Sequence, residues 1–417
     1  MYRKAMVLAV GAALAAPSAF AQVKSPAGSD WEFYGKFYPE VTYTSGGGAT
    51  PAGETVSPLS AAPTGQGAII KRSEMQISNT YIGFRASRDL GSGVKAIAQL
   101  EQTVNIDEGN GNPLGNRDSF AGLSAGWGTV RLGNMDTPFK KYGDVTGFLG
   151  VSSGNLVSPN NVMRKVSNSG PSSFNLRRAN SIDFASQTFG GLQVGVQYSI
   201  GNPTESGAGT AGINPSVNRD PRVISMAAKW EQGPFYAAAA FERHFDLFGG
   251  SGLTNIAPNA SVAVSNNTNA DAKSKDTAVQ LTGAFKFAVH TLELDVIKKQ
   301  FREIGAIPTN GFEEYKNLAY EVVLESRWTS QWRTALAYMR ANAGDCTIAN
   351  NSCSTGGMEA KQINVGLAYF FDPSTYLFGL YAKLINGSSA RYNNTANQAP
   401  GVGQDINQVA AGIAYNF

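Results

Sequence analysis

The sequence contains little histidine, and this scarcity limits the catalysis it can support. Among 417 residues there are two histidines, His244 and His290. A hydrolytic enzyme needs a nucleophile beside a general base, which is most often histidine. The strand pattern described below places the two histidines at opposite ends of their strands, and a ten-residue strand rises about 30 Å. We therefore expect rim or interface histidines, and an enzyme is the less favoured reading.

Cysteine is equally scarce, with only Cys346 and Cys353. They lie close together in a polar segment rich in Gly, Asn and Ser. In an oxidising compartment a local disulfide is favoured over two free thiols. A metal site is disfavoured, because two thiols without a nearby histidine lack ligands. We expect no metal and no cofactor.

Long apolar runs are absent after the N-terminus, where the pattern is that of a secretory signal peptide. Arg3 and Lys4 precede an apolar stretch, residues 5–16, and the small-x-small site Ala19-Phe20-Ala21 follows. This predicts a cleaved signal over residues 1–21, since the apolar stretch is shorter than the about 20 residues that span a bilayer as a helix.

Excess charge and interdomain linkers are also lacking. A net charge of +3 gives no reason to expect nucleic-acid binding. Composition does not change along the chain, and no Pro-rich or charge-rich linker divides it, so we expect a single domain over residues 22–417.

What the sequence has instead is a repeated unit: a strand of alternating polarity, a short turn, a second strand and a long polar loop. Its 47 glycines, 22 phenylalanines and 16 tyrosines suit an all-β chain with many turns. We count about 16 strands, an even number typical of bacterial barrels. The predicted strands are Asp30–Thr44, Ser73–Arg88, Val94–Ile106, Ser119–Ala125, Thr129–Met135, Ala179–Gln187, Leu192–Ile200, Val223–Glu231, Phe235–His244, Lys275–Phe287, His290–Arg302, Tyr315–Trp328, Trp332–Ala341, Lys361–Phe371, Thr375–Asn386 and Asp405–Phe417.

Two features favour a transmembrane antiparallel β-barrel over a soluble sandwich. The connections alternate between short and long, as do the periplasmic turns and outer loops of outer-membrane barrels. Aromatic residues also gather at the short turns, as in the girdle of rings at a membrane interface. The mean hydropathy of -0.19 does not oppose this, because alternation hides apolar residues from an average. These aromatic residues are Trp127, Phe189, Trp230, Phe235, Phe287, Trp328, Trp332, Phe370, Phe371, Tyr376 and Phe417.

Alternation also predicts which residues face the lumen. In Lys275–Phe287, for example, Val279 and Leu281 face lipid while Gln280 and Thr282 face inward. Charged residues fall on the inner face of many strands, which indicates an aqueous lumen, and barrels of about 16–18 strands are wide enough for one.

The stretch from Thr137 to Arg178 interrupts this rhythm. It runs without hydrophobic period for far longer than the about 12–15 residues beyond which loops are usually functional or disordered. Asp144 is its one acidic residue, against six basic ones: Lys140, Lys141, Arg164, Lys165, Arg177 and Arg178. We expect a loop that folds into the barrel and narrows the pore; the alternative is a disordered surface loop.

Several motifs, in this order along the chain, resemble Gram-negative general porins, most closely those of β-proteobacteria. They are Ile82-Gly83-Phe84-Arg85, Arg88-Asp89-Leu90-Gly91, Val94 to Glu101, Gly126 to Gly133, Asn180-Ser181-Ile182, Phe189 to Leu192, and the closing Gly412 to Phe417.

The resemblance implies a sixteen-stranded barrel that trimerises in the outer membrane among lipid and lipopolysaccharide. It implies that the third loop, residues 137–178, forms the constriction opposite a basic ladder. Phe417 would be the signal read by the outer-membrane assembly machinery. The sequence departs from the family at Tyr81 and Asn134, where arginine is common, and the loop lacks the usual acidic cluster.

We therefore expect a channel for passive diffusion of small hydrophilic solutes and ions that prefers anions. The wall alone is near neutral, because basic residues such as Lys36, Arg85 and Arg131 are balanced by acidic ones such as Glu101. The loop and the strand after it should therefore set the ion preference, through the pair Arg177 and Arg178, with Arg177 ranked slightly ahead.

Alternation places Arg177 inward and Arg178 outward unless the chain leaves the pleat there. The alternative is that the two arginines bind lipid phosphates or carboxylates at the outer rim. A narrower, substrate-selective channel for anionic or small organic solutes is the main rival for the whole chain, ahead of a non-conducting structural barrel.

Overall fold

Strands dominate the protein because its residues alternate in polarity with the two-residue period of a β-strand. The computed structural model describes residues 29–77, 79–109, 111–149, 156–168, 172–201, 220–250, 272–305, 307 and 309–417. The expected signal peptide, residues 1–21, lies outside the described residues. Within them, one sheet holds nineteen strand segments.

The segments are β1 (Ser29–Phe37), β2 (Glu40–Gly47), β3 (Arg72–Gln76), β4 (Tyr81–Gly91), β5 (Val94–Thr103), β6 (Ser119–Ala125), β7 (Gly128–Asp136), β8 (Arg177–Ser186), β9 (Leu192–Ile200), β10 (Arg222–Gln232), β11 (Phe235–Phe245), β12 (Lys273–Phe287), β13 (His290–Ile304), β14 (Phe312–Arg327), β15 (Trp332–Ala341), β16 (Asp345–Ile348), β17 (Ala360–Phe370), β18 (Thr375–Asn386) and β19 (Asp405–Asn416). One short helix, α2 (Pro138–Tyr142), and one 3-10 turn, η2 (Pro159–Asn161), lie between β7 and β8.

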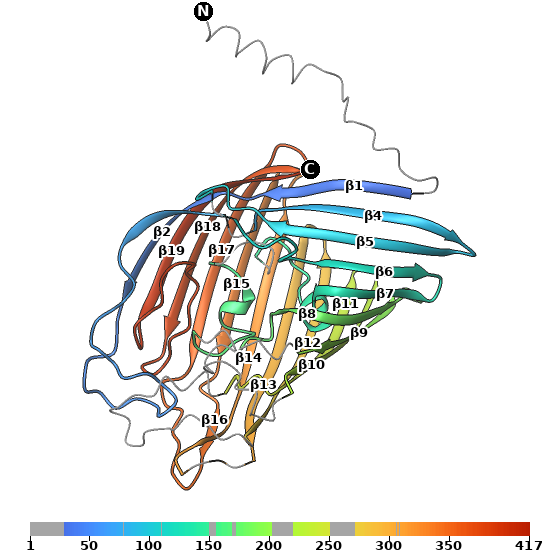
Figure 1. Cartoon of the computed structure of the whole chain (residues 1–417). Helices are drawn as coiled ribbons and strands as arrows, with labels where there is room; N and C mark the ends of the chain where they lie inside the picture. Colours follow the sequence, from blue (N-terminus) through green and yellow to red (C-terminus); the bar gives the residue numbers. More distant parts are fainter. Residues whose placement is uncertain are drawn as a thin grey trace, which may run out of the picture.

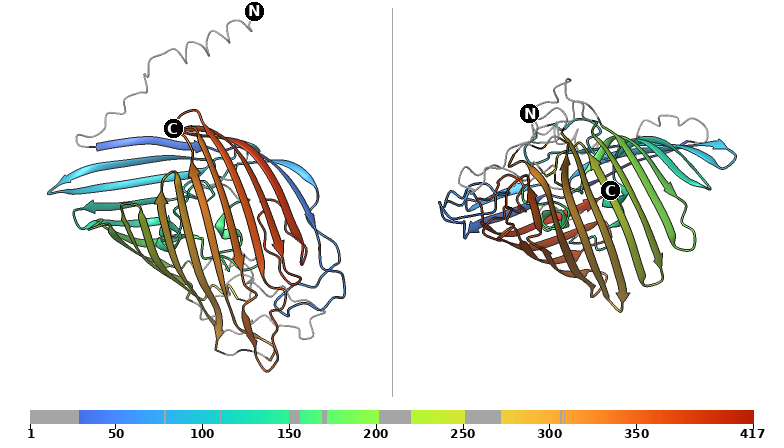
Figure 2. Two further views of the ribbon diagram at one scale, coloured as in Figure 1. Left: turned by 180° about the vertical axis from the view of Figure 1, so that it is seen from behind. Right: turned by 90° about the horizontal axis from the view of Figure 1, so that it is seen from below.

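The sheet closes on itself, because the last strand, β19, pairs with both β1 and β2. All strand pairs are antiparallel, and Figures 1 and 2 show them running around a single ring. Three interruptions divide otherwise continuous strands: β1 from β2, β3 from β4, and β15 from β16, where both segments pair with β14. With each divided strand counted once, the barrel has the sixteen expected strands.

The first two interruptions correct the predicted boundaries, which treated Asp30–Thr44 and Ser73–Arg88 as unbroken strands. Pro39 has no N–H to give to a ladder, so the first strand stops at Phe37. The N–H of Tyr38 turns to the hydroxyl of Thr80, 2.9 Å away in the gap between β3 and β4. The Tyr38 ring is fully buried and stacks on Phe378 with ring centroids 4.4 Å apart. One local bend therefore interrupts two adjacent strands.

The two ends of the barrel differ as expected. At one end the hairpins are tight: Ser92 and Gly93, between β4 and β5, have φ of 54° and 75°, as a two-residue type I′ turn requires. The long connections within the described residues lie at the other end, and the segment between β7 and β8 starts there. Exposed aromatic side chains surround the short-turn end, including Trp127, Phe189 and Trp328.

Burial confirms the predicted faces of the strands. On β12, the outward Val279, Leu281 and Phe285 are exposed, while Gln280 and Thr282 are buried on the inner side. The outward face is thus apolar and the lumen polar. None of the described helices is long and apolar enough to cross a membrane.

Candidate functional site

The segment between β7 and β8 folds back inside the barrel, where Figures 1 and 2 show it as green ribbon within the ring of strands. It begins with α2, which lies against the inner face of β10 and β11. The N–H of Phe139 donates to the hydroxyl of Ser225 at 3.1 Å. The hydroxyl of Tyr236 donates to the carbonyl of Tyr142 at 2.6 Å. Side chains of the wall therefore hold both ends of the helix.

Two wall carboxylates hold the next part of the loop. Glu293 on β13 accepts the N–H groups of Val145 at 2.8 Å and of Thr146 at 2.6 Å. Glu325 on β14 accepts the N–H of Phe148 at 3.3 Å. These wall side chains satisfy backbone groups that would otherwise be buried without partners.

Arg164 braces the returning part of the loop. Only 1% of it is exposed, and its guanidinium donates to the carbonyl of Gly143, to Gln280 on β12 at 3.2 Å and to Asn175 at 2.9 Å. It therefore links the outgoing and returning limbs to each other and to the wall. Arg164 acts as a structural cross-brace inside the loop and is not available to solutes.

Further contacts attach the loop to β13 and β17. The ammonium of Lys299 donates to the carbonyls of Met163 and Lys165. Gln362 donates to the carbonyl of Leu156 at 2.8 Å, and Asn364 to that of Val157 at 3.0 Å. The loop thus lies along the inner wall of β10–β17 and leaves the wall of β1–β8 facing the open part of the lumen.

Lys165 is also buried rather than exposed to the pore. Its ammonium donates to the carbonyl of Asn393 at 2.9 Å. Burial lowers the pKa of Lys165 to about 8. Of the six basic residues predicted to line the constriction, Arg164 and Lys165 therefore support the loop from inside.

Lys140, Lys141 and Arg177 come together at the start of the loop, and two carboxylates join them. Arg177 contacts Asp118 at 2.6 Å and Asp136 at 3.0 Å. Lys140 lies 2.8 Å from Asp136, and Lys141 lies 3.9 Å from Asp118. Three positive charges thus face two negative ones, all five side chains being between 15% and 26% exposed.

The charges in this cluster are mutually supporting. Burial alone would raise the pKa of Asp118, but Lys141 and Arg177 outweigh it and hold the pKa below its usual value. Burial lowers the pKa of Lys141, partly offset by Asp118. Asp118 and Asp136 were not among the residues predicted from sequence, although both immediately flank predicted strands. Asp136 directly precedes the loop, and the pairing of β6 with β7 brings Asp118 beside it.

Arg178 follows the exception stated in the prediction, that the chain leaves the pleat beside it. Alternation places it outward, yet only 5% of it is exposed and it is buried on the inner side. The chain leaves the pleat at Asn180, which has φ of 51°, and the pairing of β7 with β8 shifts between Gly133 and Met135. This bulge brings Arg178 inward, while Arg177 stays with Asp118 and Asp136.

The wall facing the loop carries paired charges and aromatic rings. Arg117 pairs with Glu101, and Arg131 with Asp183. The hydroxyl of Tyr34 donates to Glu101 at 3.0 Å. Arg117, which was not predicted, lies over the ring of Tyr81 at 4.4 Å.

Farther along that wall, Arg85 lies 2.6 Å from Glu32, and both side chains are 54% exposed. Lys36 is nearly buried, with its ammonium 4.5 Å from the centre of the Tyr38 ring. The predicted wall residues Lys36, Tyr81, Arg85, Glu101 and Arg131 therefore lie on the inner side, mostly in pairs.

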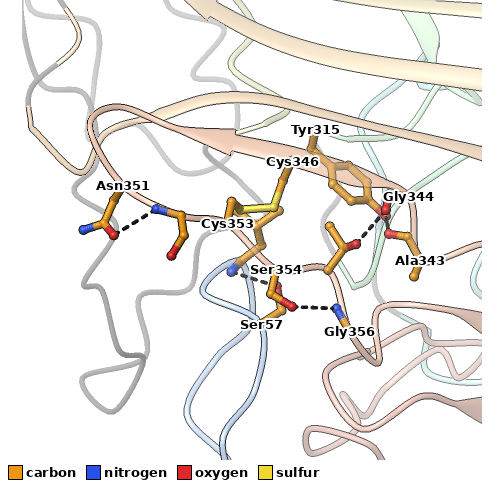
Figure 3. The surroundings of a disulfide bond; sticks show 12 residues. Ser57, Tyr315, Ala343, Gly344, Cys346, Asn351, Cys353, Ser354 and Gly356 are labelled. Carbon is orange, nitrogen blue, oxygen red and sulfur yellow. Dashed lines mark hydrogen bonds between the residues drawn. A yellow bond between two sulfur atoms is a disulfide. The ribbon is translucent and has the colours of Figure 1, made fainter.

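Cys346 and Cys353 are joined by a disulfide with Cα atoms 5.7 Å apart (Figure 3). The bond links β16, which contains Cys346, to the segment that follows it, next to the ring of Tyr315. Nearby, Thr355 donates to the carbonyl of Gly344 at 2.6 Å. The crosslink is local to an outer loop, since the two cysteines are seven residues apart.

The two histidines occupy separate places. His244 is fully buried, 2.8 Å from Glu242, and stacks on Phe174 of the loop. His290, beside a short turn, contacts Ser326 at 2.7 Å. No group of three possible metal-ligating side chains occurs among the residues that the structure describes.

The chain belongs to the Gram-negative porin family, because the model of that family matches residues 5–389. Members of this family are outer-membrane channels rather than enzymes, which locates the chain in the cell outer membrane.

Relatives with short or partial matches include major outer membrane proteins of Neisseria. The P.IB protein of Neisseria lactamica is 46% identical over 72 residues, which are 17% of this chain and 21% of that protein. The P.IB protein of Neisseria meningitidis serogroup A is 29% identical over 175 residues, covering 40% of this chain and 44% of that protein. The matched region thus spans less than half the length of these relatives.

Solved structures share the fold. The anion-selective porin from Comamonas acidovorans superimposes with a TM-score of 0.63 at 20% identity, covering 93% of this chain and all of that one. The trimer form of OmpT from Vibrio cholerae superimposes with a TM-score of 0.61 at 12% identity, covering 93% and 99%. At these identities the likeness concerns the fold.

Proposed function

We propose that this protein forms a water-filled channel in the outer membrane through which small hydrophilic solutes and ions diffuse, with a preference for anions. The observation that carries the proposal is the loop inside the barrel: it is fixed to one wall, and Lys140, Lys141 and Arg177 lie together at its start. A narrow aqueous passage between low-dielectric walls focuses the field of such charges on passing ions.

The preference is expected to be modest. Asp118 and Asp136 balance two of the three positive charges, and Arg117 and Arg131 on the facing wall are each paired with a carboxylate. The five side chains of this cluster sum to one positive unit, without Asp144, which lines the neighbouring cavity. The anion selectivity in the name of the Comamonas acidovorans porin agrees with this sign.

We further propose that the protein works as a homotrimer, by analogy with the trimer form solved for OmpT of Vibrio cholerae. The same proposal assigns five residues to the constriction: Lys140, Lys141, Asp144, Arg177 and Arg131. Contact with lipopolysaccharide and recognition of Phe417 by assembly machinery are proposals carried over from the family.

The rival is a narrower channel that selects particular anionic or small organic solutes. A planar-bilayer recording of the purified protein in a potassium chloride gradient separates the two. A general anion-preferring porin conducts both ions and gives a reversal potential of the sign set by chloride. Negligible chloride conductance together with uptake of one solute would favour the selective channel, and a reversal potential of the opposite sign would overturn the anion preference.

A further inference from the structure

A cavity of about 300 Å³ lies on the inner side of the barrel between the loop and the short-turn end. Lys141 and Asp144 line it from the loop, and Lys229, Glu231, Lys286 and Arg327 line it from β10, β12 and β14. The cavity shares Lys141 with the cluster formed by Arg177 and its two carboxylates, but none of the other residues of that cluster lines it. Its volume is at the small end of the range of ligand pockets in proteins.

Lys229 is the cation of this cavity that has no carboxylate of its own. It lies on the inner face of β10, directly opposite Ala238 of β11. Its ammonium is 5.6 Å from the centre of the Tyr142 ring, at the end of α2. Within the described part of the chain, no carboxylate lies within ion-pair distance of it. A contact with a ring face leaves ammonium hydrogens free to donate to a solute.

The other two wall cations are oriented by carboxylates but remain open to the lumen. Lys286 lies 3.2 Å from Glu231, and its side chain is 51% exposed. Arg327 lies 3.2 Å from Glu325, which is only 3% exposed, whereas the Arg327 side chain is 66% exposed. The buried carboxylate therefore fixes one edge of the guanidinium while other N–H donors face water. Such a fork suits two oxygens of one anion.

We infer that this cavity is a second anion-binding site, on the short-turn side of the constriction, for small oxoanions and carboxylates that offer several acceptor oxygens. Lys229 is its specificity-determining residue, and Arg327 and Lys286 complete the set of donors. The inference rests on the proposed diffusion function, because the lumen delivers the anion. An oxoanion, unlike chloride, can accept from an ammonium and a guanidinium at the same time, so the site discriminates among anions by geometry as well as charge.

Inorganic phosphate is the probe that tests this site. Chloride current through single channels is recorded at fixed voltage while phosphate is titrated in, and the half-maximal phosphate concentration for reduction of the current is measured. In the intact protein we expect a saturable reduction. Lys229→Gln should raise the half-maximal concentration about tenfold, the order expected for loss of one hydrogen bond to a charged group.

Lys95→Gln is the matched control. Lys95 is an exposed lysine just after the short turn between β4 and β5, opposite Asp89, and it does not line this cavity. The substitution removes the same charge near the short-turn end of the barrel, so it reports the general electrostatic effect. We expect its half-maximal concentration to stay within about twofold of the unmodified protein.

Each outcome decides the matter. A large effect of Lys229→Gln with a small effect of Lys95→Gln supports the site. Equal effects of the two substitutions, or no saturable action of phosphate on a channel that still prefers chloride, overturn the site and leave the proposed function standing. Absence of chloride conduction in the unmodified protein overturns the proposed function itself.

Discussion

Replacing Arg177 by glutamate should reverse the ion preference of the channel. At present Lys140, Lys141 and Arg177 face Asp118 and Asp136, with an excess of one positive charge. Arg177→Glu changes this by two units and leaves an excess of one negative charge. In water, a unit charge about 6 Å from an ion changes its energy by about 0.7 kcal/mol, or roughly threefold in local concentration. Because anions and cations respond in opposite directions, the ratio of the two should change roughly tenfold per unit charge before screening by salt.

The assay is the reversal potential in a tenfold potassium chloride gradient, for which an ideally selective pore gives about 59 mV. Arg177→Gln should fall between the two, near zero preference. Arg243→Glu is the control, because Arg243 faces outward in line with Phe241 and Thr277 and makes the same change of charge outside the lumen. If Arg177→Glu conducts with the reversal potential of the unmodified protein, the constriction is not where Arg177 lies and the reasoning is refuted.

Three further predictions concern the loop and the closure of the barrel. Glu293→Ala removes the acceptor for the N–H of Val145, so single-channel recordings should show a larger and noisier conductance. An unchanged single-channel conductance would mean that the position of the loop does not depend on this hydrogen bond. The pKa of Lys165 is about 8 in the folded protein against 10.5 unperturbed, so the folded state binds fewer protons than the unfolded chain between these pH values. The contribution of Lys165 to stability should therefore rise with pH across that window. Lys165→Met should flatten this rise when stability is measured by urea titration at several pH values, and an identical slope in both proteins would contradict the prediction. Phe417→Ala should destabilise the barrel by about 1–2 kcal/mol in refolding experiments, because the Phe417 ring packs on Phe37 with centroids 5.4 Å apart. A loss of stability below the error of measurement would show that the backbone hydrogen bonds with Gly35 close the barrel alone.

The fold was predictable because the alternation of polar and apolar side chains along a strand has a physical cause that applies to each residue on its own. An outward side chain must be apolar and an inward one must tolerate water, so Val279, Gln280, Leu281 and Thr282 reveal their faces without knowledge of their neighbours. The bend at Tyr38 was less accessible. Pro39 marks it in the sequence, but the hydrogen bond from Tyr38 to Thr80 joins two distant strands.

The constriction was harder to predict than the strands. The excess of basic residues between Thr137 and Arg178 identifies the segment, but not the partner of each charge. Arg164 is a cross-brace because Gln280 and Gly143 meet around it, and Arg177 is compensated because Asp118 ends the preceding outer loop beside it. Such pairings depend on the register of several strands, and a single bulge at Asn180 is enough to turn Arg178 inward.

The loop is supported mainly by one half of the barrel, and this divides the chain into regions with different tolerance of sequence change. Glu293, Glu325, Gln362 and Lys299 each hold a backbone group of the loop, so substitutions there alter the shape of the aperture together with its charge. Inward side chains of β1, β4 and β5 meet the passing ions from the other side. Substitutions in the first quarter of the sequence can therefore change the charge along the pore without loosening the loop, whereas substitutions in the second half change the size of the opening.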